Sequence, residues 1–387
     1  MVLCNPKLRL MKNDILIKIA KQYSTSAYVY DAEKIKEQYV KLQKAFKQLP
    51  YRIHYAMKAN ENIEILKIMQ DLGLGIDAVS PSEIARALQV GFDIKDIVYT
   101  PSCPDLEELK YALDKGIHVH IGAVEYLNFI AENYPDTAIG LRINPGNSIE
   151  GNQKIATAHQ NSKFGIPVRQ LDTIQTYISR GLKINSLHLH TGSDVKSWKD
   201  LARSVDTVFD FAKHFSKLSY IDLGSGFKVK YQENDPEIDL QSYAQYIEKK
   251  LKTFPYAIQL KFEPGKYLVS ESGVLLTKVN VVKQGFQKQF VGVNSGFHHL
   301  IRPMYYDAYH KIVNISNLQG EKQIYDVVGQ LCEEDTFAYD RELSEVKAGD
   351  ILAILNAGAY GYSLSSDYNL RAKPKEYLLD GDEIREV

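Results

Sequence analysis

The sequence is poor in cysteine. Its 387 residues include three cysteines, Cys4, Cys103 and Cys332, which are widely separated. An odd number of cysteines without a CxxC pair gives neither a disulfide framework nor a cysteine metal site. We therefore expect no bound metal, and the reducing cytoplasm as the location of the protein.

Long apolar runs and an excess of one charge are also missing. The N-terminal stretch MVLCNPKLRLMKNDILIKIAKQYST has no apolar run of signal-peptide length, and no segment approaches a membrane span. Lysine and arginine number 47 against 48 aspartate and glutamate residues, a formal net charge of −1. Because no basic excess attracts nucleic acid or anionic lipid, we expect the partner to be a small molecule or another protein.

Short β-rich runs alternate with amphipathic helical patterns from residue 27 to 265. The runs fall at 55–58, 76–80, 97–100, 118–122, 139–144, 184–190, 220–224 and 258–263. Eight such units predict an α/β fold, a TIM-like (β/α)8 barrel over residues 25–265. An open doubly wound sheet is the competing fold, but the GxGxxG fingerprint after the first strand is missing. The AYVYD strand and the helix at 31–49 are interpreted as a lead-in to the barrel.

The pattern changes after residue 266. Strand-like runs separated by turn residues occur at 267–286, 288–297, 322–332 and 350–360. These runs predict a second, β-rich sandwich or barrel domain of residues 266–387, joined by residues 1–24. The long polar stretch at 144–165 has the character of a functional loop or lid.

The ends of the predicted barrel strands carry a chemically mixed set of residues. Catalytic groups of such barrels lie at these carboxyl ends, where the sequence places Lys58, Asp77, Ser80, Thr100, Gly122, Arg142, Asn144, His190, Gly224, Ser225, Gly226 and Glu263. Each has an ordinary structural reading: a solvated lysine, a hydrogen-bonded histidine or a glycine turn. Their combination is more informative than any single member.

The last two strands supply the kind of loop that binds phosphate. In barrels of this type a phosphate site commonly follows strands seven and eight, where this chain has LGSGF (223–227) and FEPGK, with Pro264, Gly265 and Lys266. Glycines there allow backbone N–H groups to approach an anion. A phosphate facing a lysine, a flat histidine and a carboxylate predicts pyridoxal 5′-phosphate. Lys58 would bond to its aldehyde, His190 would stack on its ring, and Glu263 would pair with its pyridine nitrogen.

Seven motifs in order carry a family resemblance over some 300 residues. They are YAMKAN, HLHTGSD, IDLGSGF, FEPGKYLV, LIRPMYYDAYH, VVGQLCEEDTF and NAGAYGYSLSSDYNLRAKPKEYLL. The chain resembles the fold-type III pyridoxal-phosphate-dependent decarboxylases, the class-II ornithine, lysine and arginine decarboxylase family with an alanine racemase-like barrel. Within that family it most closely resembles the diaminopimelate decarboxylases.

The resemblance implies further site residues. Ser193 and Tyr360 would lie near the cofactor phosphate, with Tyr360 also within reach of the substrate, and Arg302 and Tyr306 would hold a substrate carboxylate. Glu333 would recognise the distal amino group. The resemblance also implies an obligate head-to-tail homodimer in which Cys332 and Glu333 complete the neighbouring subunit's site. Cys332 is then the candidate proton donor to the substrate carbon, with Lys58 the alternative, although a lone cysteine is more commonly a small buried hydrophobe.

Three positions depart from the family pattern. Lys266 stands where the family usually has arginine. The bidentate contact of a guanidinium is therefore lost, and the lysine ammonium can offer only a point charge to phosphate or to a substrate carboxylate. Ser225 replaces the middle glycine of the usual triplet, which is tolerable only at negative φ. The CEEDTF segment differs from the usual C-E-S-x-D, and we assign Asp335 no role.

The implied reaction converts meso-2,6-diaminopimelate to L-lysine and CO2, the last step of lysine biosynthesis. Diaminopimelate has a distal ammonium and a distal carboxylate, so its pocket needs an anion and a cation, which Glu333 and Arg302 would provide. Ornithine, arginine or carboxynorspermidine are the alternative substrates, and the first two would leave Arg302 facing a group without negative charge. An alanine racemase is disfavoured by the Cys-Glu segment. A non-catalytic regulator is disfavoured because Lys58, His190 and the phosphate loop are all present.

Overall fold

The computed structural model describes residues 13–23, 25–146 and 157–387. The chain divides into two compact units. The barrel unit comprises Lys36–Lys230 and Asn234–Leu268, and the β unit comprises Met1–Ile35, Tyr231–Glu233 and Val269–Val387. Cys4 and the middle of the predicted loop at 144–165 lie outside the described residues. Each unit is described by itself.

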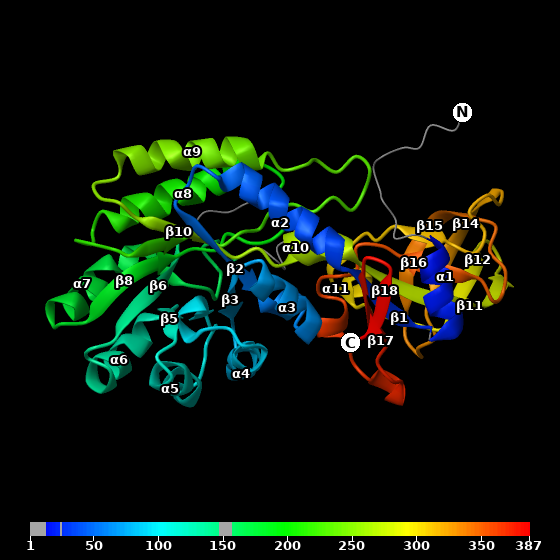
Figure 1. Cartoon of the computed structure of the whole chain (residues 1–387), viewed down its shortest axis with the longest axis horizontal. Coiled ribbons are helices and arrows are strands. Elements are labelled where there is room, and N and C mark those ends of the chain that lie inside the picture. Colours follow the sequence, from blue (N-terminus) through cyan, green and yellow to red (C-terminus); the bar gives the residue numbers. More distant parts are fainter. Residues whose placement is uncertain (1–12, 24, 147–156) are drawn as a thin grey trace. The chain divides into compact units, whose positions relative to one another are not determined.

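Eight parallel strands form the closed sheet of the barrel unit (Figure 1). In order around the ring they are β2 (Tyr51–Ala56), β3 (Gly75–Ala78), β4 (Ile97–Tyr99), β5 (His118–Ile121), β6 (Ala138–Asn144), β8 (Lys183–His188), β9 (Tyr220–Asp222) and β10 (Gln259–Phe262). The register Leu260↔Tyr51 between β10 and β2 closes the ring. The predicted (β/α)8 barrel is therefore confirmed, with one described strand for each of the eight runs. A short strand, β7 (Ile166–Pro167), pairs with the end of β6.

Helices follow the strands on the outside of the barrel (Figure 1). They are α3 (Ile63–Asp71), α4 (Pro81–Val90), α5 (Leu106–Asp114), α6 (Leu127–Asn133), α7 (Leu171–Ser179), α8 (Trp198–Ala212) and α9 (Leu240–Thr253). Local sequence explains their limits. Helix α4 begins after the Ser80 cap with Pro81 in its first turn, and ends at Gly91 with φ +106°.

Helix α2 (Ala32–Phe46) is more than the lead-in that the sequence suggested. Phe46 is fully buried and stacks on Phe262 of β10 with ring centroids 4.4 Å apart. Phe227 and Tyr243 pack around the same rings. Burial of one such aromatic side chain stabilises a fold by about 2 to 3 kcal/mol, so α2 helps hold β10 in place.

The β unit contains a nine-stranded sheet. Its strands are β1 (Ala27–Asp31), β11 (Gly273–Gln284), β12 (Gln289–Val293), β13 (Ile312–Asn314), β14 (Lys322–Val328), β15 (Thr336–Ser344), β16 (Ile351–Ile354), β17 (Lys375–Asp380) and β18 (Glu383–Glu386). Strand β1 pairs antiparallel with β11 and parallel with β17. The AYVYD segment therefore belongs to this sheet rather than leading into the barrel. Its buried side chains suit a central strand of either unit, so the pattern alone could not place it.

The first predicted run of the β domain, 267–286, also begins differently from the prediction. Residues 266–272 form the short helix α10 (Lys266–Val269) and a 3-10 turn, and the strand begins at Gly273. A short apolar run such as YLV does not distinguish a strand from a buried helical turn. Helix α1 (Asn13–Gln22) covers the sheet with Leu16 and Ile19, which pack in a core with Val29 and Leu276.

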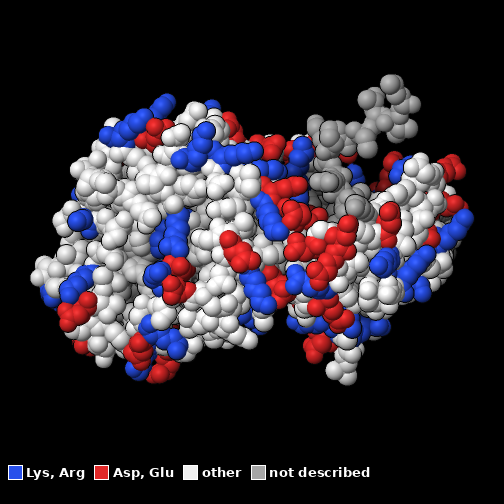
Figure 2. Space-filling model, in the orientation of Figure 1, with Lys and Arg blue, Asp and Glu red and all other residues white. Residues whose placement is uncertain are grey.

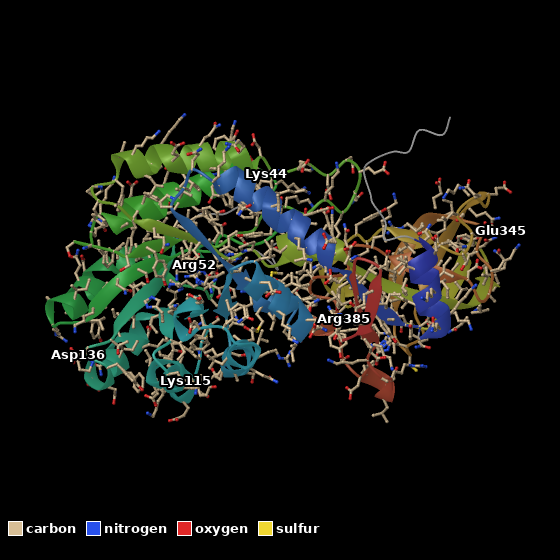
Figure 3. The ribbon with its side chains drawn as sticks, in the orientation of Figure 1. Lys44, Arg52, Lys115, Asp136, Glu345 and Arg385 are labelled. Carbon is tan, nitrogen blue, oxygen red and sulfur yellow. The ribbon has the colours of Figure 1, made fainter. Side chains whose placement is uncertain are left out.

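Charged side chains of both signs are interspersed on the face shown in Figure 2, in keeping with the net charge of −1. Ion pairs such as Asp136 with Lys183, 2.8 Å apart, are exposed, and Figure 3 shows Asp136 and Lys115 at the periphery of the barrel unit. Such exposed pairs contribute little to stability. No helix among the described residues is long and apolar enough to cross a membrane.

Candidate active site

Lys58 stands at the mouth of the barrel. It lies in the 3-10 turn (Met57–Ala59) that directly follows β2, whereas the sequence placed it on the last residues of that strand. Its Nζ lies 2.9 Å from Oδ2 of Asp77 on the neighbouring strand β3. The lysine side chain is 41% exposed and that of Asp77 only 1%. A buried acceptor therefore holds an accessible amine at the strand end.

Glu263 follows β10 directly and is buried beside His188. His188 Nε2 donates to Glu263 Oε2 across 2.9 Å. Burial would raise the pKa of Glu263, but the positive electrostatic influence and hydrogen bond of His188, with Lys58 nearby, hold that pKa well below its usual value. Glu263 is therefore a carboxylate at neutral pH. Its other oxygen, Oε1, is buried without a partner among the described residues, so it can accept one further hydrogen bond.

His190 follows β8 and carries a neutral imidazole. Burial, with repulsion from Arg142 and Lys58, lowers the pKa of His190 to about 3. The Ser225 N–H donates to His190 Nδ1 at 3.4 Å. Gly224 lies beneath the ring at φ +59°, and a Cβ there would be 2.6 Å from Nδ1. The glycine thus leaves room for the imidazole beside the loop that follows β9.

The glycine-rich loop pairs with the segment after His190. Val195 N–H donates to the Gly226 carbonyl at 2.8 Å, and a Cβ on Gly226, at φ +97°, would be 2.2 Å from the Gly192 carbonyl. Ser225 avoids positive φ, as its position required, and its hydroxyl donates to the Glu263 carbonyl at 2.9 Å. Within the described part of the chain, the Gly226 N–H and the Ser193 hydroxyl have no hydrogen-bond partner. Free donors at a strand end suit an anion.

The Pro264-Gly265-Lys266 segment joins the last strand to the first. The Pro264 carbonyl accepts from Ala56 N–H at 3.5 Å, and a Cβ on Gly265 would be 2.9 Å from the Ala56 carbonyl. This close approach brings the ends of β10 and β2 together, with Glu263 on one and Lys58 beyond the other. Lys266 is buried, and its Nζ lies 2.5 Å from Asp194 Oδ1.

Arg302 begins helix α11 (Arg302–Tyr306) in the β unit and is 7% exposed. Its Nη2 donates to Tyr231 OH at 3.2 Å and its Nε to His310 Nε2 at 3.3 Å. His310 Nδ1 donates to the Leu355 carbonyl at 2.8 Å, which leaves Nε2 as the acceptor. Burial and repulsion from Arg302 lower the pKa of His310 to about 3. Among the described residues no carboxylate pairs with Arg302, whose charge is therefore available for an anion.

The other predicted substrate residues also lie in the β unit. The Tyr306 ring centroid is 6.0 Å from the Arg302 guanidinium carbon. Cys332 and Glu333 are exposed between β14 and β15, and Glu333 Oε1 accepts from Tyr368 OH at 2.6 Å. The common role of a lone cysteine as a buried hydrophobe is wrong for Cys332. Tyr360 is half-buried at φ +55°.

Known proteins resemble this chain in sequence and in fold. A family model described as "Pyridoxal-dependent decarboxylase, pyridoxal binding domain" matches residues 32–270. The chain belongs to the pyridoxal-dependent decarboxylases. It is 35% identical to the diaminopimelate decarboxylase of Methanothermobacter thermautotrophicus over 94% of this chain and 88% of that protein.

Solved structures place the family likeness over both units. The diaminopimelate decarboxylase of Helicobacter pylori in complex with L-lysine matches with a TM-score of 0.89 and 33% identity, over 96% of this chain and 95% of that one. A lysine/ornithine decarboxylase of Vibrio vulnificus complexed with putrescine shares the fold, with a TM-score of 0.84 at 19% identity, over 96% and 99%.

The barrel residues of this pyridoxal-dependent decarboxylase fit pyridoxal phosphate, which is its cofactor. The unpartnered Glu263 Oε1 can accept from a protonated pyridine nitrogen, and the free donors of Gly226 and Ser193 can bind phosphate. The flat His190 ring and the accessible Lys58 amine complete the set.

Sequence reasoning missed a layer of histidines inside the barrel. His188 stacks on His120 with centroids 5.0 Å apart and planes 15° apart. His120 Nδ1 contacts Thr100 Oγ1 at 3.0 Å, and its Nε2 contacts Tyr220 OH at 2.8 Å. Gly140 makes room for His120, since a Cβ there would be 2.2 Å from the ring. The alternation HVH and HLH was the available signal, because residues two apart on a strand share a face.

Two buried carboxyl groups were also unassigned. Asp222 Oδ1 accepts the Gly224 N–H at 2.9 Å, and Asp222 converges with His188 and Glu263 within 4.8 Å. Burial and the negative Glu263 raise the pKa of Asp222 well above its usual value, so Asp222 holds a proton more tightly than an ordinary aspartate. Asp335 accepts the N–H groups of Phe297 and Leu331 at 2.7 and 3.1 Å, which is a role in shaping the backbone.

Proposed function

We propose that this protein removes CO2 from the D-configured centre of meso-2,6-diaminopimelate and releases L-lysine, as the last step of lysine biosynthesis. The observation that carries the proposal is the buried Arg302, which has no carboxylate partner among the described residues. A site with an unneutralised guanidinium selects a substrate that brings its own second carboxylate. The diaminopimelate decarboxylase relatives, one of them complexed with L-lysine, support the same substrate.

The cofactor residues are proposed as follows. When bound, pyridoxal phosphate supplies an electron sink for the charge left at the substrate carbon as CO2 departs. Lys58 would hold the cofactor through its amine, and Asp77 would orient that amine. Glu263 would hold the pyridine nitrogen, because its carboxylate is ionised and its Oε1 has no partner among the described residues. His190 supports the ring through its flat neutral face.

The phosphate is proposed to bind the loops after β8, β9 and β10. Residues of this site are Ser193, Gly224, Ser225, Gly226, Pro264, Gly265, Lys266 and Tyr360. The free N–H of Gly226 and the hydroxyl of Ser193 are donors of the kind that bind an anion without adding charge.

The distal end of the substrate is proposed to be recognised by four residues of the β unit together with Lys266 of the barrel unit. Arg302 and Tyr306 bind its carboxylate and Glu333 its ammonium, with Lys266 and Tyr360 completing the contacts. Glu333 accepts a hydrogen bond from Tyr368, and this bond can orient its carboxylate toward a cation. Ornithine, arginine and carboxynorspermidine decarboxylation remain the alternative activities.

We further propose a cytoplasmic homodimer with shared active sites. The barrel unit would be the cofactor domain, and the β unit, which includes the AYVYD strand, would be the substrate and interface domain. Cys332 is exposed, so it can serve as the proton donor in a neighbouring subunit's site. Mixing inactive Lys58→Ala and Cys332→Ala chains should then restore about a quarter of the wild-type activity, because one site in each mixed dimer keeps both residues. Failure of the mixture to regain activity would argue against shared sites.

Carbon dioxide release tests the proposed reaction. The purified protein with pyridoxal phosphate is incubated separately with diaminopimelate, ornithine, arginine and carboxynorspermidine, and released CO2 is measured. We expect release from diaminopimelate with lysine as the amino-acid product. Release from another substrate alone would assign the alternative activity, and cofactor binding without any release would favour a regulator.

A further inference from the structure

Lys266 is bound by an internal carboxylate. Its Nζ lies 2.5 Å from Asp194 Oδ1, and the other oxygen of the same carboxylate, Oδ2, lies 3.6 Å from Lys228 Nζ. The side chains of Lys266 and Lys228 are only 7% and 5% exposed. Lys228 also contacts Asp235 at 3.2 Å. One carboxylate therefore bridges two buried ammonium groups.

These charges come from three different strand ends. Asp194 belongs to the segment after β8, Lys228 follows the glycine-rich loop after β9, and Lys266 follows β10. The same three segments line the proposed phosphate site. The ion cluster of Asp194, Lys228 and Lys266 therefore links the walls of that site to one another.

Asp194 is well placed to fix the residue before it. Its backbone is left-handed, with φ +67°, and the next residue, Val195, donates to the Gly226 carbonyl at 2.8 Å. Ser193 thus lies between the His190 segment and two held residues, Asp194, whose carboxylate contacts two lysines, and Val195, which is fixed by backbone pairing. A held carboxylate restricts the directions in which the Ser193 hydroxyl and neighbouring N–H groups can point.

We propose that Asp194 is a positioning residue of the phosphate site, and that Lys266 acts through Asp194 rather than as a direct phosphate ligand. The proposal rests on the assignment of this end of the barrel to the cofactor phosphate. A lysine lacks the planar fork by which an arginine could bind Asp194 and a phosphate at once in fixed geometry. The phosphate is then bound by Ser193 and backbone donors, which the ion cluster holds in place.

The effect of Asp194→Asn on cofactor affinity distinguishes this indirect role of Lys266 from direct contact between Lys266 and the phosphate. If Lys266 bound the phosphate itself, Asp194 would be a competing anion, and Asp194→Asn would strengthen cofactor binding. If Asp194 holds the segment, the same change leaves two buried lysines that repel each other and releases Ser193. Cofactor binding then weakens.

Equilibrium binding of two probes to the full chain provides the test. Pyridoxal 5′-phosphate and pyridoxal, which lacks the phosphate, are titrated into wild type, Asp194→Asn, Lys266→Met and the double variant, with Lys213→Met as control. Lys213 is an exposed lysine paired with Asp210 at 2.7 Å. We expect each single change to weaken pyridoxal phosphate binding about tenfold or more, because a charge-assisted contact is lost. Binding of pyridoxal and binding by the control should change less than about twofold.

The double variant measures whether the two residues act together. It should bind pyridoxal phosphate no more weakly than the weaker single variant, because the two changes break the same contact. Tighter binding by Asp194→Asn, or additive losses in the double variant, would overturn the proposal. A wild type that binds neither probe would instead refute the cofactor assignment.

A second double-mutant cycle tests the proposal if Asp194→Asn does not fold, which circular dichroism would reveal. Ser193→Ala, Lys266→Met and their combination are titrated in the same way. Non-additive losses in pyridoxal phosphate affinity are expected if Lys266 acts through the 191–194 segment. Additive losses would show that Lys266 and Ser193 bind the phosphate independently, and would overturn the proposal.

Discussion

At the residue scale, several site side chains depend on the absence of a neighbouring side chain. His190 rests against Gly224, and His120 against Gly140, at positions where a Cβ would come within 2.6 and 2.2 Å of the ring. These two imidazoles thus require a glycine on the adjacent strand or loop. These pairs are a packing requirement that single motifs do not express.

Gly224→Ala tests this dependence. The change adds a left-handed strain of about 1 to 2 kcal/mol and a clash with His190, so we expect lower stability and loss of cofactor binding. Gly73→Ala is the matched control, since Gly73 has φ +76° and nothing within 4 Å of the added carbon. Urea unfolding should show a loss of stability in both variants, while cofactor titration should show a defect only in Gly224→Ala. Equal cofactor affinity in the two variants would refute the packing argument.

Arg302→Leu tests the proposed substrate contact. Loss of a buried cation opposite a substrate carboxylate should lower kcat/KM for diaminopimelate about a hundredfold or more, with cofactor absorbance unchanged. Arg385→Leu, a change at an arginine 40% exposed and labelled in Figure 3, is the control and should keep full activity. An unchanged rate in Arg302→Leu would remove Arg302 from the substrate site.

At the element scale, helix α4 has a pH-sensitive start. Its Ser80 cap accepts the Glu83 N–H at 3.2 Å, and the Glu83 carboxyl accepts the Val79 N–H at 2.7 Å. Burial raises the pKa of Glu83 to about 7. The folded protein holds this proton more tightly than the unfolded chain, so its contribution to stability falls as pH rises from about 4.5 to about 7.

Glu83→Gln should therefore stabilise the protein above pH 7 and leave stability unchanged near pH 4. The glutamine keeps an acceptor for Val79 without a buried charge, and the gain is at most about 3 kcal/mol. Glu108→Gln provides a control at the equivalent position of α5, where Asp105 is the cap. Thermal melts across pH 4 to 8 measure the difference, and a Glu83→Gln gain that is the same at every pH would contradict the argument.

At the level of the whole molecule, neutral histidines that are half-buried or buried occur in both units. Burial is the leading cause that lowers the pKa of His118 to about 4 and that of His190 to about 3 in the barrel unit, and that of His310 to about 3 in the β unit. The unfolded chain binds these protons from about pH 6.5 downward, whereas the folded chain resists them. Each group therefore contributes stability that is present above pH 6.5 and is lost as pH falls toward its folded pKa.

We expect the free energy of unfolding to fall steeply between pH 6.5 and 4. Each such histidine contributes about 1.4 kcal/mol per pH unit in that window, and His118→Gln should reduce the slope by about that amount. The glutamine can keep a bond to Ser186 Oγ, which His118 Nε2 contacts at 2.8 Å. His214→Gln, at an exposed position, is the control. An unchanged slope in His118→Gln would contradict the assignment of a neutral buried ring.

The sequence alone was enough to predict the eight strands of the barrel, because alternation, helix caps and glycine turns are local properties of the chain. It also determined the cofactor class, since strand-end residues of a parallel barrel converge wherever the barrel closes. By contrast, the folded structure was needed to show that β1 belongs to the β unit, that histidines fill the barrel interior, and that Lys266 is bound by Asp194. These outcomes depend on which segments pack together, and a buried strand or a lysine carries no local mark of its distant partner.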